Sequence, residues 1–102
     1  MAKYEVVFSQ QADADLAKIK KFYARQIVNR IETVLVHRAE DVTRSSVKKL
    51  RGFESLYRLR AGDYRIFYQV QFDKVTILRV LSKEKEAEFY EEAKRYENNS
   101  DG

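Results

Sequence analysis

Three arginines in the middle of the chain, Arg58, Arg60 and Arg65, are the residues whose spacing best suits chemistry. Arg58 and Arg60 alternate with apolar residues in a strand-like run, and Arg65 follows in the next run, after a tight turn. If the hairpin register brings Arg65 to the face of the other two, three guanidiniums converge on one patch. Such a patch could hold an RNA phosphate bidentately and stabilise a pentacoordinate phosphorus transition state. The alternative is that these are solvated positions, each paired with Glu54, Asp63 or a helix carboxylate.

Positive charge is concentrated around this predicted hairpin. The chain has 20 Lys and Arg against 16 Asp and Glu, a net charge of only +4. Between positions 44 and 65 the acids are Glu54 and Asp63, whereas the basic residues are Arg44, Lys48, Lys49, Arg51, Arg58, Arg60 and Arg65, with Arg38 just before them. This distribution is expected of a surface that meets nucleic acid or an acidic partner. Lys48, Lys49 and Arg51 are candidates for guiding RNA phosphates, and an ordinary solvated loop is the alternative.

Other kinds of site have few residues available. The chain has no cysteine and a single histidine, His37, which excludes disulfides, thiolate nucleophiles and multi-histidine metal sites. His37 is expected near the end of a helix, in a structural role. No metal or cofactor is predicted. The first ten residues lack the features of a signal peptide, and no apolar run approaches the roughly 20 residues that span a bilayer. We therefore expect a cytoplasmic protein without a membrane partner.

The elements before the hairpin can be read from the pattern of apolar residues. Residues 3–8 alternate and then become apolar, which predicts a first strand. Ser9 is a natural helix N-cap, with Asp13 in the first turn after it. Apolar residues at helical spacing up to about Arg38 predict two helices or one broken helix. The polar, basic segment from Asp41 to Gly52 is expected to be a loop.

Three strand-like runs follow, over residues 56–61, 63–71 and 74–82, each rich in β-branched or aromatic residues. The short turns between them predict an antiparallel meander, with Tyr64 and Tyr68 on the face opposite the arginines. Residues 83–96 predict a C-terminal helix, and the tail at 98–102 is expected to be disordered. A chain of 102 residues has the usual size of one domain, which we place at 1–97.

The segment from Lys48 to Tyr68 resembles a known signature. KKLRG at 48–52 is followed at 56–68 by LYRLRAGDYRIFY, and together they resemble the central signature of the RelE/ParE superfamily of toxins from bacterial and archaeal toxin–antitoxin systems. The likeness extends to the order of elements from about residue 3 to about residue 96. It implies a small RelE-like α+β fold: an antiparallel sheet with two N-terminal helices packed on it and a C-terminal helix, in the order β-α-α-β-β-β-α. It also implies an antitoxin partner whose segment wraps the toxin.

The resemblance implies one of two activities. RelE-like members are metal-independent endoribonucleases that inhibit translation by cutting mRNA in the ribosomal A site, with the nucleotide's own 2′-hydroxyl as nucleophile. ParE-like members instead act on DNA gyrase. A third reading is an inactive relative that only binds its antitoxin and, through that complex, operator DNA. The arginines favour the first activity, whereas the lack of an arginine after the last predicted strand favours the second.

The resemblance also assigns roles to the three arginines of the hairpin. Arg58 and Arg60 match the two basic positions of the second strand of the family signature, which are often lysine in RelE-like enzymes. Arg65 matches the arginine that would bind the scissile phosphate. Because an arginine does not readily give up its proton, Arg58 and Arg60 are poor general bases.

The C-terminal part of the implied site departs from the family pattern. RelE-like nucleases commonly carry an arginine after the last strand, where this chain has Lys83 and Lys85 among glutamates. Either lysine is a candidate to replace that arginine and to deprotonate the 2′-hydroxyl, unless the arginines act mainly by electrostatics. Tyr90 matches the family tyrosine that stacks on or orients the substrate, with packing of the last helix as the alternative.

Overall fold

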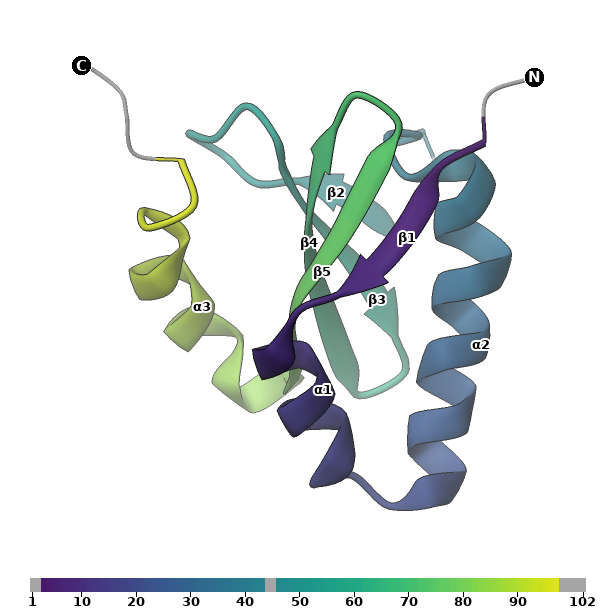
Figure 1. Cartoon of the computed structure of the whole chain (residues 1–102). Helices are drawn as coiled ribbons and strands as arrows, with labels where there is room; N and C mark the ends of the chain where they lie inside the picture. Colours follow the sequence, from purple (N-terminus) through teal and green to yellow (C-terminus); the bar gives the residue numbers. More distant parts are fainter. Residues whose placement is uncertain (1–2, 44–45, 98–102) are drawn as a thin grey trace.

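The structure is a computed structural model, and it describes residues 3–43 and 46–97. The elements in chain order are β1 Glu5–Phe8, α1 Gln10–Ala17, α2 Lys21–Arg38, β2 Val47–Lys49, β3 Leu56–Ala61, β4 Tyr64–Gln71, β5 Lys74–Ser82, the 3-10 helix η1 Lys83–Lys85 and α3 Glu86–Ala93. The strands form a five-stranded sheet in the order β1-β5-β4-β3-β2. Helices α1 and α2 pack toward one face of the sheet and α3 lies against the other (Figure 1). The predicted α+β fold class is confirmed.

The two N-terminal helices are separate, and local chemistry explains where the first one begins. Ser9 Oγ accepts a hydrogen bond from the N–H of Ala12 at 3.0 Å, so Ser9 caps α1 as predicted. The break between the helices, which the sequence left unplaced, falls at residues 18–20. There the N–H of Lys18 turns back to the carbonyl of Asp15 at 3.1 Å. No proline or glycine marks the break, because neither residue occurs before Gly52.

The sheet is antiparallel across the predicted meander and parallel at one edge. In the β3–β4 hairpin, Tyr57 lies opposite Tyr68 and Arg60 lies opposite Arg65. The turn at Gly62 has a φ of +60°, which a glycine adopts without strain. Strand β1 runs parallel to β5, with Glu5 opposite Lys74. The sheet was predicted to be antiparallel and is mixed. The two helices that follow β1 form part of the crossover connection that a parallel pair of strands needs.

The prediction of a loop over Asp41–Gly52 is wrong for the centre of this segment, which forms β2. Val47–Lys49 pairs antiparallel with β3, and Lys48 lies opposite Arg58. Val47 is fully buried and Leu50 is nearly so, and these two apolar side chains anchor an otherwise polar segment to the sheet. The predicted C-terminal helix over 83–96 is also shorter, because it starts as η1 and continues as α3 only to Ala93. The tail predicted to be disordered, 98–102, lies outside the described residues.

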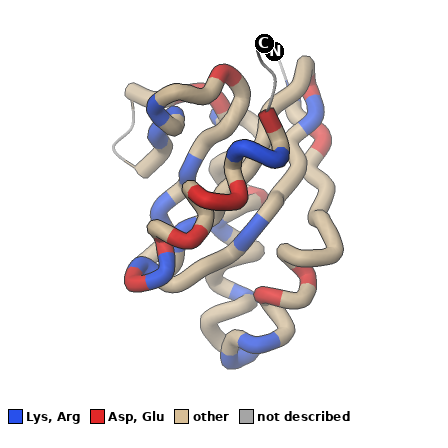
Figure 2. The backbone as a smooth tube through the Cα atoms, turned by 90° about the vertical axis from the view of Figure 1, so that its left-hand side faces the viewer, with Lys and Arg blue, Asp and Glu red and all other residues tan. Residues whose placement is uncertain are grey.

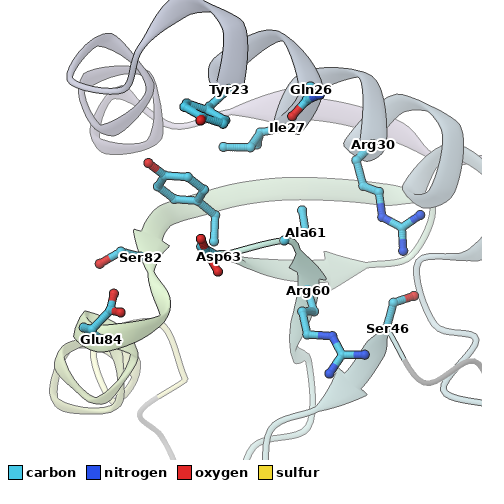
Figure 3. A pocket seen from close by; sticks show the side chains of 12 residues that line it. Tyr23, Gln26, Ile27, Arg30, Ser46, Arg60, Ala61, Asp63, Ser82 and Glu84 are labelled. Atoms are coloured by element: carbon cyan, nitrogen blue, oxygen red, sulfur yellow. The ribbon is translucent and has the colours of Figure 1, made fainter.

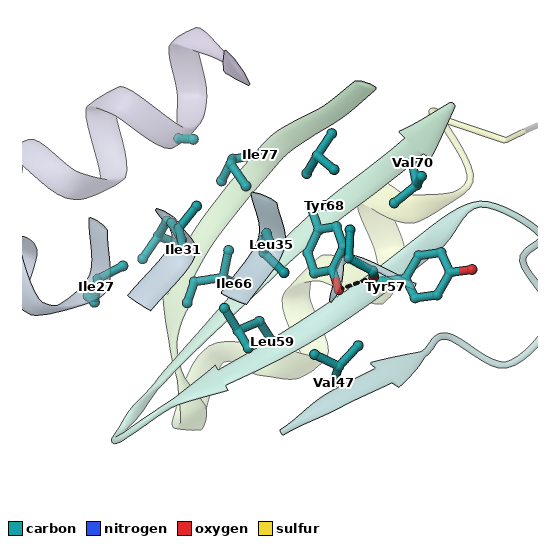
Figure 4. Packing of buried hydrophobic residues seen from close by; sticks show 14 residues of the cluster. Ile27, Ile31, Leu35, Val47, Tyr57, Leu59, Ile66, Tyr68, Val70 and Ile77 are labelled. Carbon is teal, nitrogen blue, oxygen red and sulfur yellow. Dashed lines mark hydrogen bonds between the residues drawn. The ribbon is translucent and has the colours of Figure 1, made fainter. Parts of the chain in front are cut away.

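Apolar side chains fill both sides of the sheet and fix which way each strand faces. On the α2 side, Ile31 and Leu35 pack with Ile66 and Tyr68, whose hydroxyl donates to the carbonyl of Ala39 at 2.7 Å (Figure 4). On the α3 side the rings of Phe67 and Phe89 stack with their centroids 4.3 Å apart. The tyrosines of β4 therefore face α2, as predicted, and the arginines face α3. No helix in the described part of the chain is long and apolar enough to cross a membrane.

Candidate functional site

The three arginines of the hairpin lie on the sheet face that α3 covers. Arg60 is directly opposite Arg65, and Arg58 is opposite Phe67, two residues further along β3. Figure 2 looks from the side of α3 and shows the acidic segments of this helix lying across a sheet with basic segments. We call Arg58, Arg60 and Arg65 the arginine patch. The sequence made this shared face depend on the hairpin register, and the pairing of Arg60 with Arg65 provides that register.

Glu86, the first residue of α3, joins two members of the arginine patch. Its Oε2 forms an ion pair with Nη1 of Arg58, and its Oε1 lies 3.7 Å from Nε of Arg65. The three side chains are 18%, 13% and 24% exposed for Arg58, Arg65 and Glu86, so the cluster is largely shielded from water. Arg58 and Arg65 are therefore paired with a helix carboxylate, which is the alternative that the sequence left open.

Glu86 was missed as a site residue, although the sequence does contain a signal for it. Glu86, Phe89 and Ala93 stand at helical spacing, and Phe89 and Ala93 are the buried residues of α3. Residues at i, i+3 and i+7 share one face of a helix. The burial of Phe89 and Ala93 therefore turns Glu86 toward the sheet, where the arginines lie.

Hydrogen-bond donors remain unused in the arginine patch. The Nε atoms of Arg58 and Arg65 are buried and donate no hydrogen bond within the described residues. Nη1 of Arg65 donates to the carbonyl of Gly62 at 3.0 Å and to that of Tyr64 at 3.1 Å, which fixes this guanidinium at the end of the hairpin. Arg60 is exposed beside it. Two guanidiniums share one carboxylate, so the patch retains positive charge and free donors for a further anion.

Tyr90 lies next to the pair formed by Glu86 and Arg58. Its ring stands edge-on to Phe67, with centroids 6.2 Å apart and an interplanar angle of 78°. Burial raises the pKa of Tyr90 and Glu86 raises it further, while Arg58 lowers it. The ring remains 38% exposed. Tyr90 is thus partly packed, in agreement with the structural alternative, and partly open to a ligand.

The two candidate lysines lie at the start of the C-terminal helical segment. Nζ of Lys83 is 3.6 Å from Oδ1 of Asp63 in the hairpin turn, with both side chains exposed. The N–H of Lys83 also donates to the carbonyl of Asp63 at 2.8 Å. Lys85 is exposed and immediately precedes α3. The ion pair of Lys83 therefore joins it to the hairpin turn, while Glu86 is the residue of this segment that contacts the arginines.

The three basic residues before β3 extend the positive surface at the sheet edge. Lys48 lies opposite Arg58 in the register of β2 with β3, and Lys49 follows it. Lys48, Lys49 and Arg51 are all exposed. His37 is also exposed and lies in the last turn of α2, near the helix end where the sequence predicted it. No group of three His, Asp or Glu side chains in residues 3–43 and 46–97 could hold a metal ion.

A cleft of about 990 Å³ opens between α2 and the end of the β3–β4 hairpin (Figure 3). Arg30 and Arg60 lie at one end of it, Tyr23 forms part of its wall on α2, and Asp63 and Glu84 lie toward the other end. Arg60 belongs both to this cleft and to the arginine patch. The positive surface of the hairpin therefore continues around the sheet edge into the cleft.

Comparison with known proteins agrees with this arrangement of elements. The family model described as ParE toxin of type II toxin–antitoxin system, parDE, matches residues 6–87. Toxin RelE3 of Methanocaldococcus jannaschii is 28% identical over 79 residues, which cover 78% of this chain and 90% of the relative. A free-state double mutant of E. coli toxin RelE has a TM-score of 0.71 at 26% identity, covering 91% of this chain and 97% of that chain.

An archaeal RelE–RelB complex from Pyrococcus horikoshii OT3 is also similar, with a TM-score of 0.64, 26% identity and coverage of 79% of this chain and 96% of that chain. The match to the ParE family model runs from β1 into the first turn of α3, so it includes both the arginine patch and Glu86. It spans well over half of the chain. The chain therefore belongs to the RelE/ParE superfamily and is a RelE-like toxin of a type II toxin–antitoxin system.

Proposed function

We propose that this toxin is an endoribonuclease that cuts mRNA on the ribosome and thereby stops translation. The observation that carries this proposal is the arginine patch, in which the buried Nε donors of Arg58 and Arg65 are unused. Guanidiniums in a shielded site stabilise the charge that develops on phosphorus more strongly than they would in water. The similarity to Toxin RelE3 and to the solved RelE structures supports the same activity.

The proposed reaction needs only groups of the RNA, of this chain and of water. The 2′-hydroxyl of a nucleotide attacks its own 3′-phosphate, and Arg58 and Arg65 bind the non-bridging oxygens of that phosphate. Arg60 lies opposite Arg65 and neutralises a neighbouring phosphate. Lys48, Lys49 and Arg51 guide the backbone along the sheet edge, and the open face of the Tyr90 ring stacks on a base. Lys83 and Lys85 are exposed at the start of the C-terminal helical segment and remain candidates to replace the family arginine.

We also propose that the toxin is held inactive by a cognate antitoxin. The similar archaeal structure from Pyrococcus horikoshii is a complex of RelE with RelB, and other similar structures are toxin–antitoxin complexes as well. A small DNA-binding protein with an acidic segment, encoded beside this toxin, would meet the positive surface described above. Operator DNA would then be bound only through the antitoxin complex.

The test is to express the toxin from a tightly controlled promoter and to map the 5′ ends of cellular mRNAs. We expect codon-phased cuts within translated regions. Arg65→Ala should lower the cleavage rate by about 100- to 1,000-fold, the usual cost of removing one donor to a transition-state oxyanion. Arg25→Ala is the matched control, because it removes the same charge from an exposed position of α2. Intact mRNA with the wild-type toxin, or an Arg65→Ala variant that cuts normally, would refute the proposal.

A second candidate function is a ParE-like toxin that acts on a protein target such as DNA gyrase. The description of the matched family favours it, since that family is named for ParE. The carboxylate of Glu86 within the arginine patch favours it too, because an anion competes with phosphate there. The same expression experiment separates the two functions. Intact mRNA together with gyrase-linked DNA breaks would identify the second.

A further inference from the structure

We propose that Glu86 is the general base of the cleavage reaction and accepts the proton of the attacking 2′-hydroxyl. The proposal rests on the ribonuclease function given above. It assigns a catalytic role to the carboxylate that pairs with Arg58 and Arg65. It also answers how a site built from arginines can begin a reaction that requires the loss of a proton.

A proton acceptor is needed, and the arginine patch itself does not contain one. Arginine stays protonated in proteins, so Arg58, Arg60 and Arg65 cannot take the proton. Tyr90 has a raised pKa and is a neutral phenol at cellular pH. Within residues 3–43 and 46–97, the single carboxylate that forms ion pairs with the arginine patch is Glu86. A carboxylate is ionised at neutral pH and can accept a proton directly.

The contacts of Glu86 place its two oxygens beside the groups that would bind the phosphate. One oxygen pairs with Nη1 of Arg58, and the other lies 3.7 Å from Nε of Arg65. Arg58 and Arg65 carry two positive charges against the single negative charge of Glu86, and neither buried Nε atom donates a hydrogen bond within the described residues. This excess of positive charge favours a phosphate beside Glu86. The base and the reacting phosphate are then held side by side.

The step balances in atoms and electrons without a further reactant. The O–H bond of the 2′-hydroxyl breaks, and its proton passes to a carboxylate oxygen of Glu86. The electron pair left on the 2′-oxygen forms the new bond to phosphorus, and the bond from phosphorus to the 5′-oxygen breaks. The departing 5′-oxygen takes a proton from water, and Glu86 later returns its proton to water. The product is a 2′,3′-cyclic phosphate.

The groups around Glu86 make its titration separable from theirs. Arg58 faces it from β3, Arg65 from β4 and Tyr90 from its own helix, α3. The guanidiniums keep their charge at every pH that the fold tolerates. The phenol of Tyr90 remains neutral in acid. A carboxylate base therefore predicts a wild-type cleavage rate that falls as the pH is lowered, and this fall should be absent in Glu86→Gln.

The test uses single-turnover cleavage of ribosome-bound mRNA at saturating toxin, with wild type, Glu86→Gln, Glu86→Asp and Glu88→Gln. Glu88→Gln makes the same chemical change at an exposed position of the same helix. We expect Glu86→Gln to lose about 100-fold or more of the saturating rate, Glu86→Asp to keep more of it, and Glu88→Gln to resemble wild type. Binding of an mRNA with a 2′-deoxy nucleotide at the cut site should be at least as tight for Glu86→Gln as for wild type, because the substitution removes a negative charge that repels the phosphate.

The results separate failure of this inference from failure of the proposed function. If wild type does not cut mRNA, the ribonuclease function is refuted. If wild type cuts and Glu86→Gln cuts equally fast or faster, Glu86 only blocks the site and is not the base. A loss confined to binding of the 2′-deoxy mRNA would also overturn the assignment. Should Glu86→Gln fail to fold, the cleavage rates of wild type and Glu86→Asp are measured across a range of pH. A rate that does not fall in acid contradicts a carboxylate base.

Discussion

The members of the arginine patch are held in different ways, although they stand on one face of one hairpin. Two backbone carbonyls of the turn accept from Arg65, Glu86 pairs with Arg58, and Arg60 is exposed. Arg65 is therefore fixed by the hairpin itself, whereas the position of Arg58 depends on α3. Since rigid groups lose little entropy when a ligand binds, Arg65 is the better preorganised phosphate ligand.

Two variants of Tyr90 separate the contribution of its ring from that of its hydroxyl. If the ring stacks on a base, Tyr90→Phe should cut mRNA at close to the wild-type rate, because the edge contact with Phe67 and the exposed face are kept. Tyr90→Ala should lower cleavage by about 10-fold or more, since stacking on a base is worth about 1–3 kcal/mol. Single-turnover cleavage of ribosome-bound mRNA measures both effects.

The matched control for Tyr90 is thermal unfolding of the same two variants. Tyr90→Ala removes a partly exposed ring, so it should unfold at a temperature only slightly below that of Tyr90→Phe. Equal losses of cleavage in the two variants would contradict stacking. They would instead assign the chemical role to the hydroxyl.

At the scale of elements, the end of α3 is fastened to the loop before β3. The carboxylate of Glu97 accepts from the N–H of Glu54 at 2.7 Å and also accepts from both the N–H and the hydroxyl of Ser55. Nearby, Nε2 of Gln69 donates to the carbonyl of Tyr96 at 3.3 Å. These bonds hold the C-terminal end of the segment whose N-terminal end carries Glu86. The placement of Glu86 on the arginine patch is thus supported from the residues that follow α3.

The attachment of α3 through Glu97 should depend on pH. Burial alone would raise the pKa of Glu97, but hydrogen bonds from Ser55 and Glu54, together with nearby Lys49, outweigh it and lower the pKa below 4.5. The folded pKa is depressed, so this stabilisation is fully present above the unfolded value of 4.5 and is lost as the pH falls through the folded value. Wild type should therefore melt above Glu97→Gln at neutral pH, and the difference should shrink below about pH 4.5.

The control for this pH dependence is Glu91→Gln, at an exposed position of α3. It should leave the melting temperature almost unchanged across the same range of pH. A constant difference in melting temperature between wild type and Glu97→Gln would show that the carboxylate charge does not contribute to holding the helix.

The strands with a clear pattern of residues could be predicted from the sequence, and the short strand without such a pattern could not. β-branched and aromatic residues over β3, β4 and β5 give enough alternation to predict both the strands and the shared face of the arginines. Strand β2 escaped prediction because a three-residue strand with only Val47 buried has no readable period. Glu86 could not be singled out because several glutamates surround the lysines and charge alone does not distinguish them. Its contact depends on the packing of Phe89 against Phe67, which is not a local property of the sequence.

At the scale of the whole molecule, one ion-pair network joins the two sides of the sheet. Arg79 of β5 donates from Nε to Asp15 of α1 at 2.7 Å and from Nη2 to the same carboxylate at 3.0 Å, and its Nη1 pairs with Glu92 of α3. Asp15 also accepts from the N–H of Val80 at 2.9 Å and is only 9% exposed. The network therefore ties α1, β5 and α3 together around a nearly buried carboxylate.

Removal of the Asp15 carboxylate should weaken the whole fold. Asp15→Ala leaves the N–H of Val80 and two donors of Arg79 unpaired in a shielded place, which should lower the free energy of unfolding by about 3 kcal/mol. Asp15→Asn keeps an acceptor of the same shape and should lose less. Urea denaturation measures both values, with Asp13→Ala as the control because Asp13 is exposed on the same helix.

Because α3 shares the network and carries Glu86, Asp15→Ala should also slow mRNA cleavage, although the ion-pair partner of Asp15 is Arg79. An Asp15→Ala toxin as stable as Asp13→Ala would show that α1 and α3 are held independently, and the arginine patch would then depend on α3 alone.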